Sequence, residues 1–221
     1  MPASATVDGR HLRREQNRAT VLDALVELFH EGMYEPSSAE IAERAGLSPR
    51  SLFRYFDDID DLNRSAVERH VNTHRALFEI EIDPNGPTTS KIEQFVDARV
   101  RLHETVAPAA RAARLSAHRH DVLAAQLYET RAFMRAQVLR TFARELEGER
   151  VALLPAVDEL CSFEAYEFMR NGHRMSRAKV AAALIAALTQ LLKTHDLSRQ
   201  IRPARGDHQR TIMRSNERGT S

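Results

Sequence analysis

The chain has 221 residues, 43% hydrophobic and 29% charged, which is enough for one large or two small globular domains with a core. Its formal net charge of +1 neither favours nor excludes a nucleic-acid partner. The 8 Gly and 8 Pro are too few for the turns of a many-stranded sheet, and no apolar run approaches the roughly 20 residues of a membrane-spanning helix.

The amino terminus lacks the apolar stretch of a secretory signal. The one cysteine, Cys161, excludes an internal disulfide framework and suits a reducing compartment. We therefore expect a cytoplasmic protein that does not associate with a membrane.

Hydrophobic periodicity predicts a first helix from about Arg13 to His30, after a polar, disordered arm of residues 1–12. Val21 and Leu25 belong to a set of apolar residues spaced three and four apart, which places them on one helical face. Gly32 follows the last turn, and glycine is the usual residue just past a helix end.

A short second helix begins with a capping box. Ser37 and Glu40 stand three apart, so that each side chain can satisfy a free backbone N–H of the other. The helix is expected to end at Ala45, and Gly46 then supplies a turn. Small residues before that turn would let another helix cross closely, as a helix-turn-helix requires.

A third helix is predicted from Ser48, as its cap, through Pro49 to Phe56, since proline is tolerated in a first turn. Its pattern divides into two faces. The expected apolar anchors are Leu52, Phe53 and Phe56, and the expected outward residues are Pro49, Arg50, Arg54 and Tyr55.

The rest of the chain reads as helices and one prominent turn. Asp57 or Asp58 caps a helix from about Ile59 to Glu81, and the turn cluster Asp83–Pro87 follows. Further helices are expected over residues 90–105, 108–116, 122–146, 154–170 and 176–195, before a basic, disordered tail at 198–221.

The run SSAEIAERAGLSPRSLFRYFDDIDDL and the preceding LVELFHEGMYE resemble the N-terminal domain of the TetR/AcrR family of transcription regulators. A later run, SFEAYEFMRNGHRMSRAKVAAALIAALTQLL, is similar to the last two helices of many members. The resemblance implies an all-α fold. An N-terminal three-helix bundle with a helix-turn-helix, residues 13–65, would join a helical effector-binding and dimerisation domain at 66–197.

The candidate DNA-binding residues lie on the second and third helices. Arg50 lies near the amino end of the third helix, which enters the major groove in such motifs, so we expect it to contact a base. Arg54 and Tyr55 are expected to contact phosphates, which position the protein without reading sequence. The full candidate set is Ser37, Ser38, Ser48, Pro49, Arg50, Ser51, Arg54 and Tyr55.

Two positions depart from the family pattern. Phe53 stands where a Tyr is common, and Ile59, within an acidic cluster, stands where a Lys is frequent. Residues 1–62 hold seven Arg and no Lys against twelve Asp and Glu, a net charge of −5 that opposes phosphate binding. DNA affinity is therefore expected to depend on Arg residues around the first helix, namely Arg13, Arg14 and Arg18.

The C-terminal domain offers apolar, aromatic and polar residues that suit a small-molecule pocket, although an aromatic residue at helical spacing more often belongs to an ordinary core. The candidates are Phe95, His103, Tyr128, Phe133, Met134, Phe163, Tyr166 and Phe168. The final helix has apolar residues among many alanines, which suits either a close interface between two subunits or a core helix of one chain. Its apolar residues are Val180, Leu184, Leu188 and Leu191.

We expect a homodimeric repressor that binds a pseudo-palindromic operator in double-stranded DNA and is released by a small apolar or amphipathic effector. The alternative is a helix-turn-helix regulator without such a ligand, controlled by a partner or acting constitutively. An enzyme is a remote third hypothesis, because the sequence shows no Gly-rich phosphate loop, no cofactor motif and no metal-ligand set. His70 and His74 have metal-binding spacing without a third ligand, and Cys161 suits a buried thiol.

Overall fold

A computed structural model describes the backbone of residues 4–193 and their side chains apart from those of residues 4–8, 10 and 60. The predicted tail at 198–221 and the first three residues of the predicted arm lie outside this part. Residues 4–193 contain no strand. Their helices are α1 (Ser4–His30), α2 (Ser38–Arg44), α3 (Pro49–Leu52), α4 (Ile59–Thr73), α5 (Arg75–Phe78), α6 (Thr88–Ser116), α7 (Asp121–Thr141), η1 (Gly148–Leu153), α8 (Leu154–Leu160), α9 (Phe163–Glu167), the π-helix η2 (Phe168–Gly172) and α10 (Arg177–Leu192).

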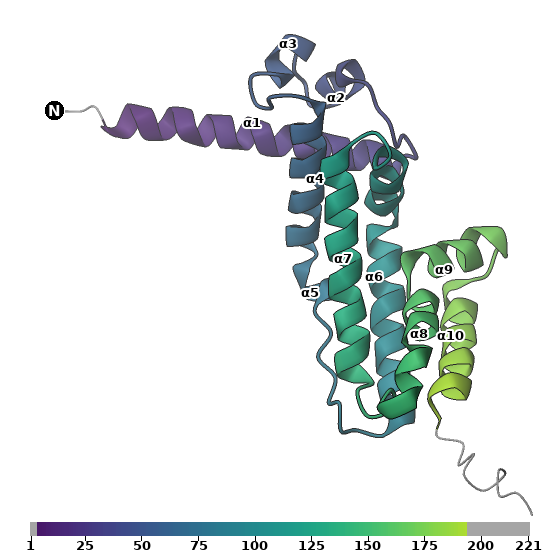
Figure 1. The fold of residues 1–221 in the computed structure, drawn as a ribbon. Helices are drawn as coiled ribbons and strands as arrows, with labels where there is room; N and C mark the ends of the chain where they lie inside the picture. The colour runs from purple at the N-terminus through teal and green to yellow at the C-terminus, as the bar shows by residue number, and fades with distance from the viewer. Residues whose placement is uncertain (1–3, 194–221) are drawn as a thin grey trace, which may run out of the picture.

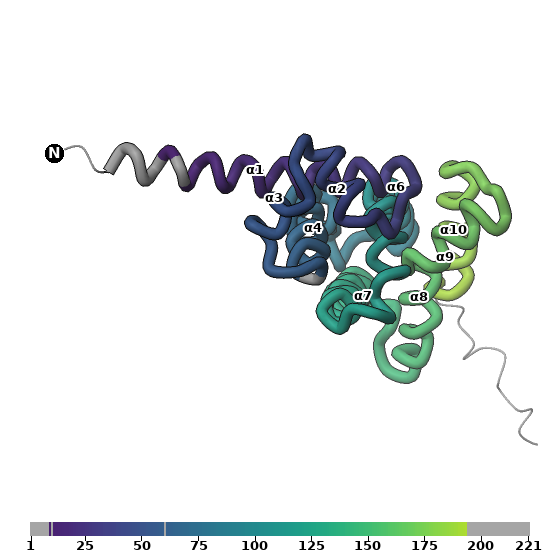
Figure 2. Tube along the Cα trace, turned by 90° about the horizontal axis from the view of Figure 1, so that it is seen from above, coloured from purple at the N-terminus to yellow at the C-terminus, as the bar shows by residue number. Residues whose placement is uncertain are grey.

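The long helices form an elongated body with α1 lying across one end. Figure 1 shows α4, α6 and α7 side by side, and each of these three contacts the other two. Helices α8 and α10 lie along the same body, with α10 packed against α6 and α8 against α7. Seen from above, α1 crosses over α4 and α6 (Figure 2), and Figure 1 shows its amino-terminal half extending away from the body.

Two hydrophobic cores hold this arrangement together. The first joins α1–α4 and includes Leu25, Leu52 and Phe56, and α6 closes it with Ala109 and Ala112. The second joins α6–α10 through a larger set of side chains, among them Phe95, Val138, Phe142, Tyr166 and Leu188. Because α6 contributes to both cores, the two ends of the molecule share one continuous helix.

The predicted stop signal at the carboxyl end of α1 is confirmed. Gly32 has a φ of 87°, Gly32 N–H donates to Phe29 (3.0 Å), and Met33 N–H donates to Leu28 (2.9 Å). These bonds satisfy carbonyls at the end of α1, as a left-handed glycine allows. The expected start is wrong, because α1 begins at Ser4 rather than near Arg13. Polar residues deny this segment a core contact, but they do not oppose extension of a helix that is already nucleated.

Several predicted helix bounds are also corrected. The segments expected at 90–105 and 108–116 form one helix, α6, with Pro108 inside it, because buried residues on both sides of the proline hold the helix to the two cores. The helix expected at 154–170 is divided, since the Ser162 hydroxyl accepts from Ala165 N–H at 3.0 Å and starts α9 anew. Helix α4 ends at Thr73, and α3 ends at Leu52 rather than Phe56.

One buried ion pair joins α6 to the turn that follows α7. Lys91 Nζ lies 2.7 Å from Glu145 Oε2, and the two side chains are 1% and 7% exposed. Lys91 also donates to the Pro84 carbonyl at 2.8 Å, and Thr88 donates to the second Glu145 oxygen at 2.7 Å. Burial opposes ionisation of Glu145, but the hydrogen bonds from Lys91 and Thr88 outweigh it and lower the pKa of that carboxyl.

We expect Lys91→Met to lower the free energy of unfolding by about 3–5 kcal/mol, because it leaves the Glu145 charge buried without its partner. The double variant Lys91→Met/Glu145→Leu should recover most of that loss. Arg101→Met, which breaks the exposed Arg101–Asp97 pair, is the control and should cost about 1 kcal/mol or less. Denaturation followed by circular dichroism measures all three, and equal losses for Lys91→Met and Arg101→Met would contradict the prediction.

Candidate nucleic-acid interface and internal cavity

The start of α2 is the predicted capping box. Ser37 N–H donates to Glu40 Oε2 at 2.7 Å, and Glu40 N–H donates to Ser37 Oγ at 3.3 Å. The Ser37 hydroxyl also donates to the same Glu40 oxygen at 2.7 Å, and these bonds lower the pKa of Glu40. The Ser37 hydroxyl proton is therefore directed at a carboxylate, whereas Ser38 begins the helix with a half-buried side chain.

The turn between α2 and α3 depends on one glycine. Gly46 has a φ of 69°, a left-handed conformation that favours glycine, and its N–H donates to Glu43. Leu47 N–H donates to the carbonyl of Ala42 at 2.8 Å, which closes the end of α2. The predicted Gly-containing turn of a helix-turn-helix is thus present.

Helix α3 is short and strongly capped. The Ser48 hydroxyl accepts from Ser51 N–H at 3.2 Å, and the Ser48 and Ser51 hydroxyls lie 2.9 Å apart. After Leu52 the chain tightens, with Arg54 N–H donating to Ser51 and Tyr55 N–H donating to Leu52. Leu52 and Phe56 are buried in the first core, so two of the three predicted anchors are confirmed.

Phe53 is not an anchor, because 48% of its surface is exposed. The tighter turn after Leu52 breaks the helical spacing from which its inward position was predicted. Pro49, Arg50 and Arg54 are exposed, as expected. Neither of these two arginines pairs with a carboxylate whose side chain the structure describes.

Tyr55 lies between the exposed face of α3 and the core. Its ring packs against the first core and is half-buried. Asn17 Nδ2 of α1 donates to the Tyr55 hydroxyl at 2.8 Å, which fixes the ring and leaves the phenolic proton free for an outside acceptor.

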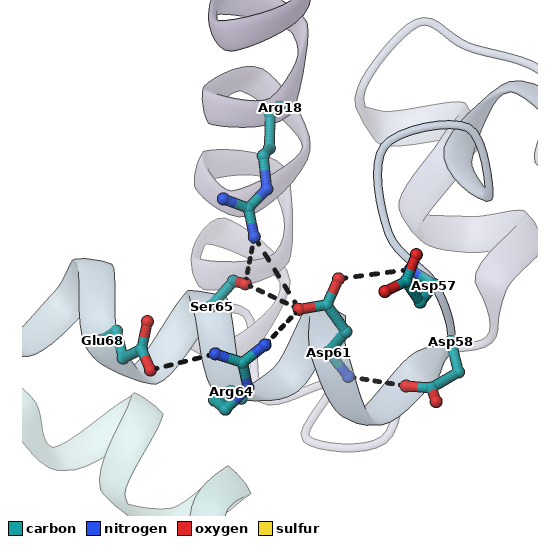
Figure 3. A network of polar contacts seen from close by, with 7 residues as sticks. All are labelled: Arg18, Asp57, Asp58, Asp61, Arg64, Ser65 and Glu68. Atoms are coloured by element: carbon teal, nitrogen blue, oxygen red, sulfur yellow. Dashed lines mark hydrogen bonds and ion pairs between the residues drawn. The ribbon is translucent and has the colours of Figure 1, made fainter.

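The acidic cluster after α3 is a structural network (Figure 3). Asp58 is the cap of α4 and accepts from Asp61 N–H at 2.7 Å. Asp61 in turn accepts from Asp57 N–H at 3.2 Å and from Arg64 at 2.6 Å. Of the two predicted caps, Asp58 is therefore the one that caps α4. The charge of Asp61 is largely neutralised within the domain.

Arg18 belongs to the same network rather than to an open cationic surface. Its Nη2 donates to Ser65 Oγ at 2.5 Å and lies 3.8 Å from Asp61 Oδ1 (Figure 3). Its guanidinium also lies over the Phe56 ring, 5.1 Å from the ring centre. Arg18 therefore fastens α1 to α4 beneath α3, whereas Arg13 and Arg14 are exposed.

A cavity lies between α4, α6, α7 and the α8–α9 corner. It encloses about 90 Å³ that the centre of a water molecule can reach, which is room for several waters or a small organic group. Three predicted pocket residues line it, namely His103, Met134 and Phe163.

The other pocket candidates lie elsewhere. Phe95 is fully buried in the second core, and Tyr166 is buried with its ring 5.5 Å from that of His103. Three further candidates are exposed, namely Tyr128, Phe133 and Phe168, because the faces of α7 and η2 that carry them point away from the cores.

Sequence reasoning missed the charged part of the cavity wall. Arg99 lies in the same stripe of α6 as Phe95 and His103, four residues from each, and a charged residue at a core position is a detectable signal. The other charged or titratable residues of the wall are His70, Arg114, Arg131, Asp158 and Glu164.

The two histidines of the wall are neutral near pH 7. Burial lowers the pKa of His103 to about 4, although its Nε2 hydrogen bonds the Cys161 carbonyl at 3.0 Å. Burial also lowers the pKa of His70 to about 4, and its ring stacks edge-on with His74. Among the described side chains, no group of three or more His, Cys, Asp or Glu is arranged to hold a metal ion.

No helix within residues 4–193 is long and apolar enough to cross a membrane. A comparison of the sequence with curated proteins found no match. The family model described as "Bacterial regulatory proteins, tetR family" matches residues 21–66.

Solved structures share the whole fold at low sequence identity. A transcriptional regulator from Rhodococcus sp. Rha1 is 18% identical, with a TM-score of 0.64 over 79% of this chain and 95% of that one. A tetR-family transcriptional regulator from Streptomyces coelicolor is 19% identical, with a TM-score of 0.63 over 80% of each chain. The multidrug binding protein EbrR, complexed with imidazole, is 18% identical, with a TM-score of 0.51 over 80% and 94%.

The matched segment, residues 21–66, spans the capping box of α2, the Gly46 turn, α3 and the Asp58 cap of α4. The predicted resemblance to the TetR/AcrR family is therefore confirmed: residues 21–66 match the tetR family of bacterial regulatory proteins, and the chain shares its all-helical fold with solved structures of transcriptional regulators, one of them described as tetR-family.

Proposed function

We propose that the protein is a homodimeric transcription repressor that binds a pseudo-palindromic operator and is released by a small-molecule effector. The supporting observation is the exposed surface of α3 and the turn after it, where Arg50 and Arg54 have no carboxylate partner among the side chains that the structure describes. Leu52 and Phe56 anchor that helix from beneath.

The side chains of α3 and of the turn that follows it suit different parts of a duplex. Arg50, near the amino end of the helix, suits the two acceptors of a guanine edge in the major groove. Arg54 and the free phenolic proton of Tyr55 suit phosphate oxygens. The exposed ring of Phe53 suits the methyl group of a thymine, a contact that the commoner Tyr at this position would make more polar.

The Ser hydroxyls make a smaller contribution in this proposal. Ser48 and Ser51 already share a hydrogen bond, and Ser37 donates to Glu40. Backbone N–H groups at the start of α3 remain suited to phosphate. Base and phosphate recognition therefore depends mainly on the two arginines, together with the exposed Arg13 and Arg14 of α1.

The homodimer is supported by the outer face of α10. Val180, Leu184 and Leu188 are buried against α6 and serve the core of one chain. The opposite face exposes a run of small side chains, which allow a second helix to approach closely. They are Ala178, Ala182, Ala183 and Ala186.

Effector control is supported by the position of the cavity against α4. Val67, His70 and Val71 of α4 line the cavity, while Leu62 and Ala66 of the same helix are buried in the first core. A molecule in the cavity therefore contacts the helix that carries the DNA-binding end. The multidrug-binding relative described above adds weight to a small-molecule effector.

The rival regulator without a small-molecule ligand would leave this cavity without a role. Burial raises the pKa of the Cys161 thiol to about 12, which lends no support to a nucleophilic enzyme. A cytoplasmic location stays a prediction from the sequence.

Selection of bound duplexes from a random pool should enrich a pseudo-palindrome with half-sites about one or more helical turns apart. Arg50→Ala should lose preference at one symmetric position, at a cost of about 1–3 kcal/mol, because a base contact disappears. Arg54→Ala should weaken binding to all sequences and reduce the salt slope by about 1. Arg140→Ala, an exposed arginine of α7, is the matched control, and a pool without an enriched palindrome would refute the function.

Ala182→Glu should shift the protein toward monomer in light scattering, because the added charge would be buried against the second subunit. Ala132→Glu places the same charge on an exposed site of α7 and should leave the dimer intact. A dimer that is equally stable in both variants would rule out α10 as the interface.

A further inference from the structure

Arg99 is buried without a carboxylate partner. Only 1% of its surface is exposed, and its one protein hydrogen bond in the described structure runs from Nη2 to the Met134 carbonyl, at 2.8 Å. Its Nε and Nη1 atoms are buried and have no hydrogen-bond partner. Because arginine stays protonated in proteins, a full charge with unused donors lies within the C-terminal domain.

The other arginines of the cavity wall are neutralised by acids. Arg114 lies 2.9 Å from Glu164, and Arg131 lies 3.3 Å from Glu159. Asp158 also lines the cavity and its charge attracts that of Arg99 through space, but no ion pair within 4 Å joins the two, and burial raises the pKa of the Asp158 carboxyl. Arg99 is thus the arginine of this wall that lacks a carboxylate partner among the described side chains.

Such a group is costly in an empty cavity. An unpaired buried ion costs several kcal/mol, and burial lowers the pKa of Arg99 to about 10, which still leaves it charged at pH 7. The Phe95 ring, 4.9 Å from the guanidinium carbon, offsets part of that cost. An anion placed in the cavity would offset more, because its oxygens could accept from the unused N–H groups in a site of low dielectric.

Apart from Arg99, Arg114 and the two histidines, the residues that α4 and α6 contribute to the wall are apolar. Leu102, Val106, Ala109 and Ala113 of α6 line it opposite Val67 and Val71 of α4. The space of about 90 Å³ suits a compact hydrocarbon body rather than a large hydrated anion. Because Arg114 and Arg131 are paired with acids, Arg99 is the cation of this wall that is left for a ligand with a single negative charge at one end.

We propose that the cavity binds an apolar carboxylic acid of short to medium length, whose carboxylate pairs with Arg99 and whose hydrocarbon lies against α4 and α6. The proposal rests on the proposed function, since it names the chemical class of the effector. His70, whose buried Nε2 also lacks a hydrogen-bond partner, lies on the α4 wall of the same cavity. The ligand would therefore contact both Arg99 of α6 and α4, the helix that carries the DNA-binding end.

Calorimetric titration of the full-length protein with butanoate, hexanoate and octanoate tests the proposal, with hexan-1-ol and hexylamine as neutral and cationic analogues. At least one acid should bind about tenfold or more tightly than the alcohol, and the amine should bind weakest. Arg99→Met should weaken the best acid about tenfold or more while leaving the alcohol nearly unchanged. Arg101→Met, an exposed neighbour on α6, is the control and should bind the acid as the unaltered protein does.

A second measurement separates a ligand-binding role for Arg99 from a structural one. Without ligand, Arg99→Met should melt at the same or a higher temperature, because an uncompensated buried charge is removed. A lower melting temperature, binding that does not distinguish acid from alcohol, or no binding of any of the three acids would each overturn the proposal. DNA selection with Arg99→Met should still enrich the same palindrome, so a failure here is distinguishable from a failure of the proposed function.

Discussion

The structure depends on the burial of small side chains along α6. Ala109 and Ala112 close the first core beneath α1, and Val96 and Val100 of the same helix lie in the second. Small side chains let α1 and α4 approach α6 closely, so the DNA-binding end is packed onto the body and is not connected to it by a flexible linker. This packing also explains how α6 continues through Pro108, whose missing N–H costs one helical hydrogen bond that burial on both sides outweighs.

Charge in the DNA-binding domain is better understood residue by residue than as a net value. Acids outnumber arginines there, but several of those acids are paired: Glu31 with Arg44 inside residues 1–62, and Asp61 and Asp23 with Arg64 and Arg69 farther along α4. The acids are therefore partly neutralised by internal arginines. The free guanidinium groups of Arg50 and Arg54 remain at α3, so the local field at the face proposed to meet DNA is more positive than a sum of −5 suggests.

Local chemistry could be predicted from the sequence, and tertiary geometry could not. Ser37 with Glu40, Gly46 and Ser48 act through hydrogen bonds between neighbours in the chain, so their spacing alone predicted the caps and the turn. Phe53 is exposed because the chain leaves the regular helix and forms a tighter turn after Leu52. Hydrophobic periodicity assumes a regular helix, so it placed Phe53 on the wrong side. Of the pocket residues, the apolar and aromatic pattern predicted His103, Met134 and Phe163 but not Arg99, because a charged side chain does not fit a pattern of apolar walls.

The same buried charge would set the scale of the effector control that we propose. A hundredfold change in DNA affinity requires an effector to favour one conformation over the other by about 2.7 kcal/mol. If α4 slid along the cavity as a rigid rod, the apolar contacts of the ligand with Val67 and Val71 would be kept in both conformations. Those contacts alone would then favour neither conformation. A charge-assisted bond to Arg99 contributes about 1.5–3 kcal/mol and requires a defined geometry, so it is strong in one arrangement of α4 and α6 and weak in the other. In the complex that we propose, a ligand held on α6 by its charge and on α4 by its hydrocarbon would therefore respond to the spacing of those two helices, both of which contribute to the core of the DNA-binding end.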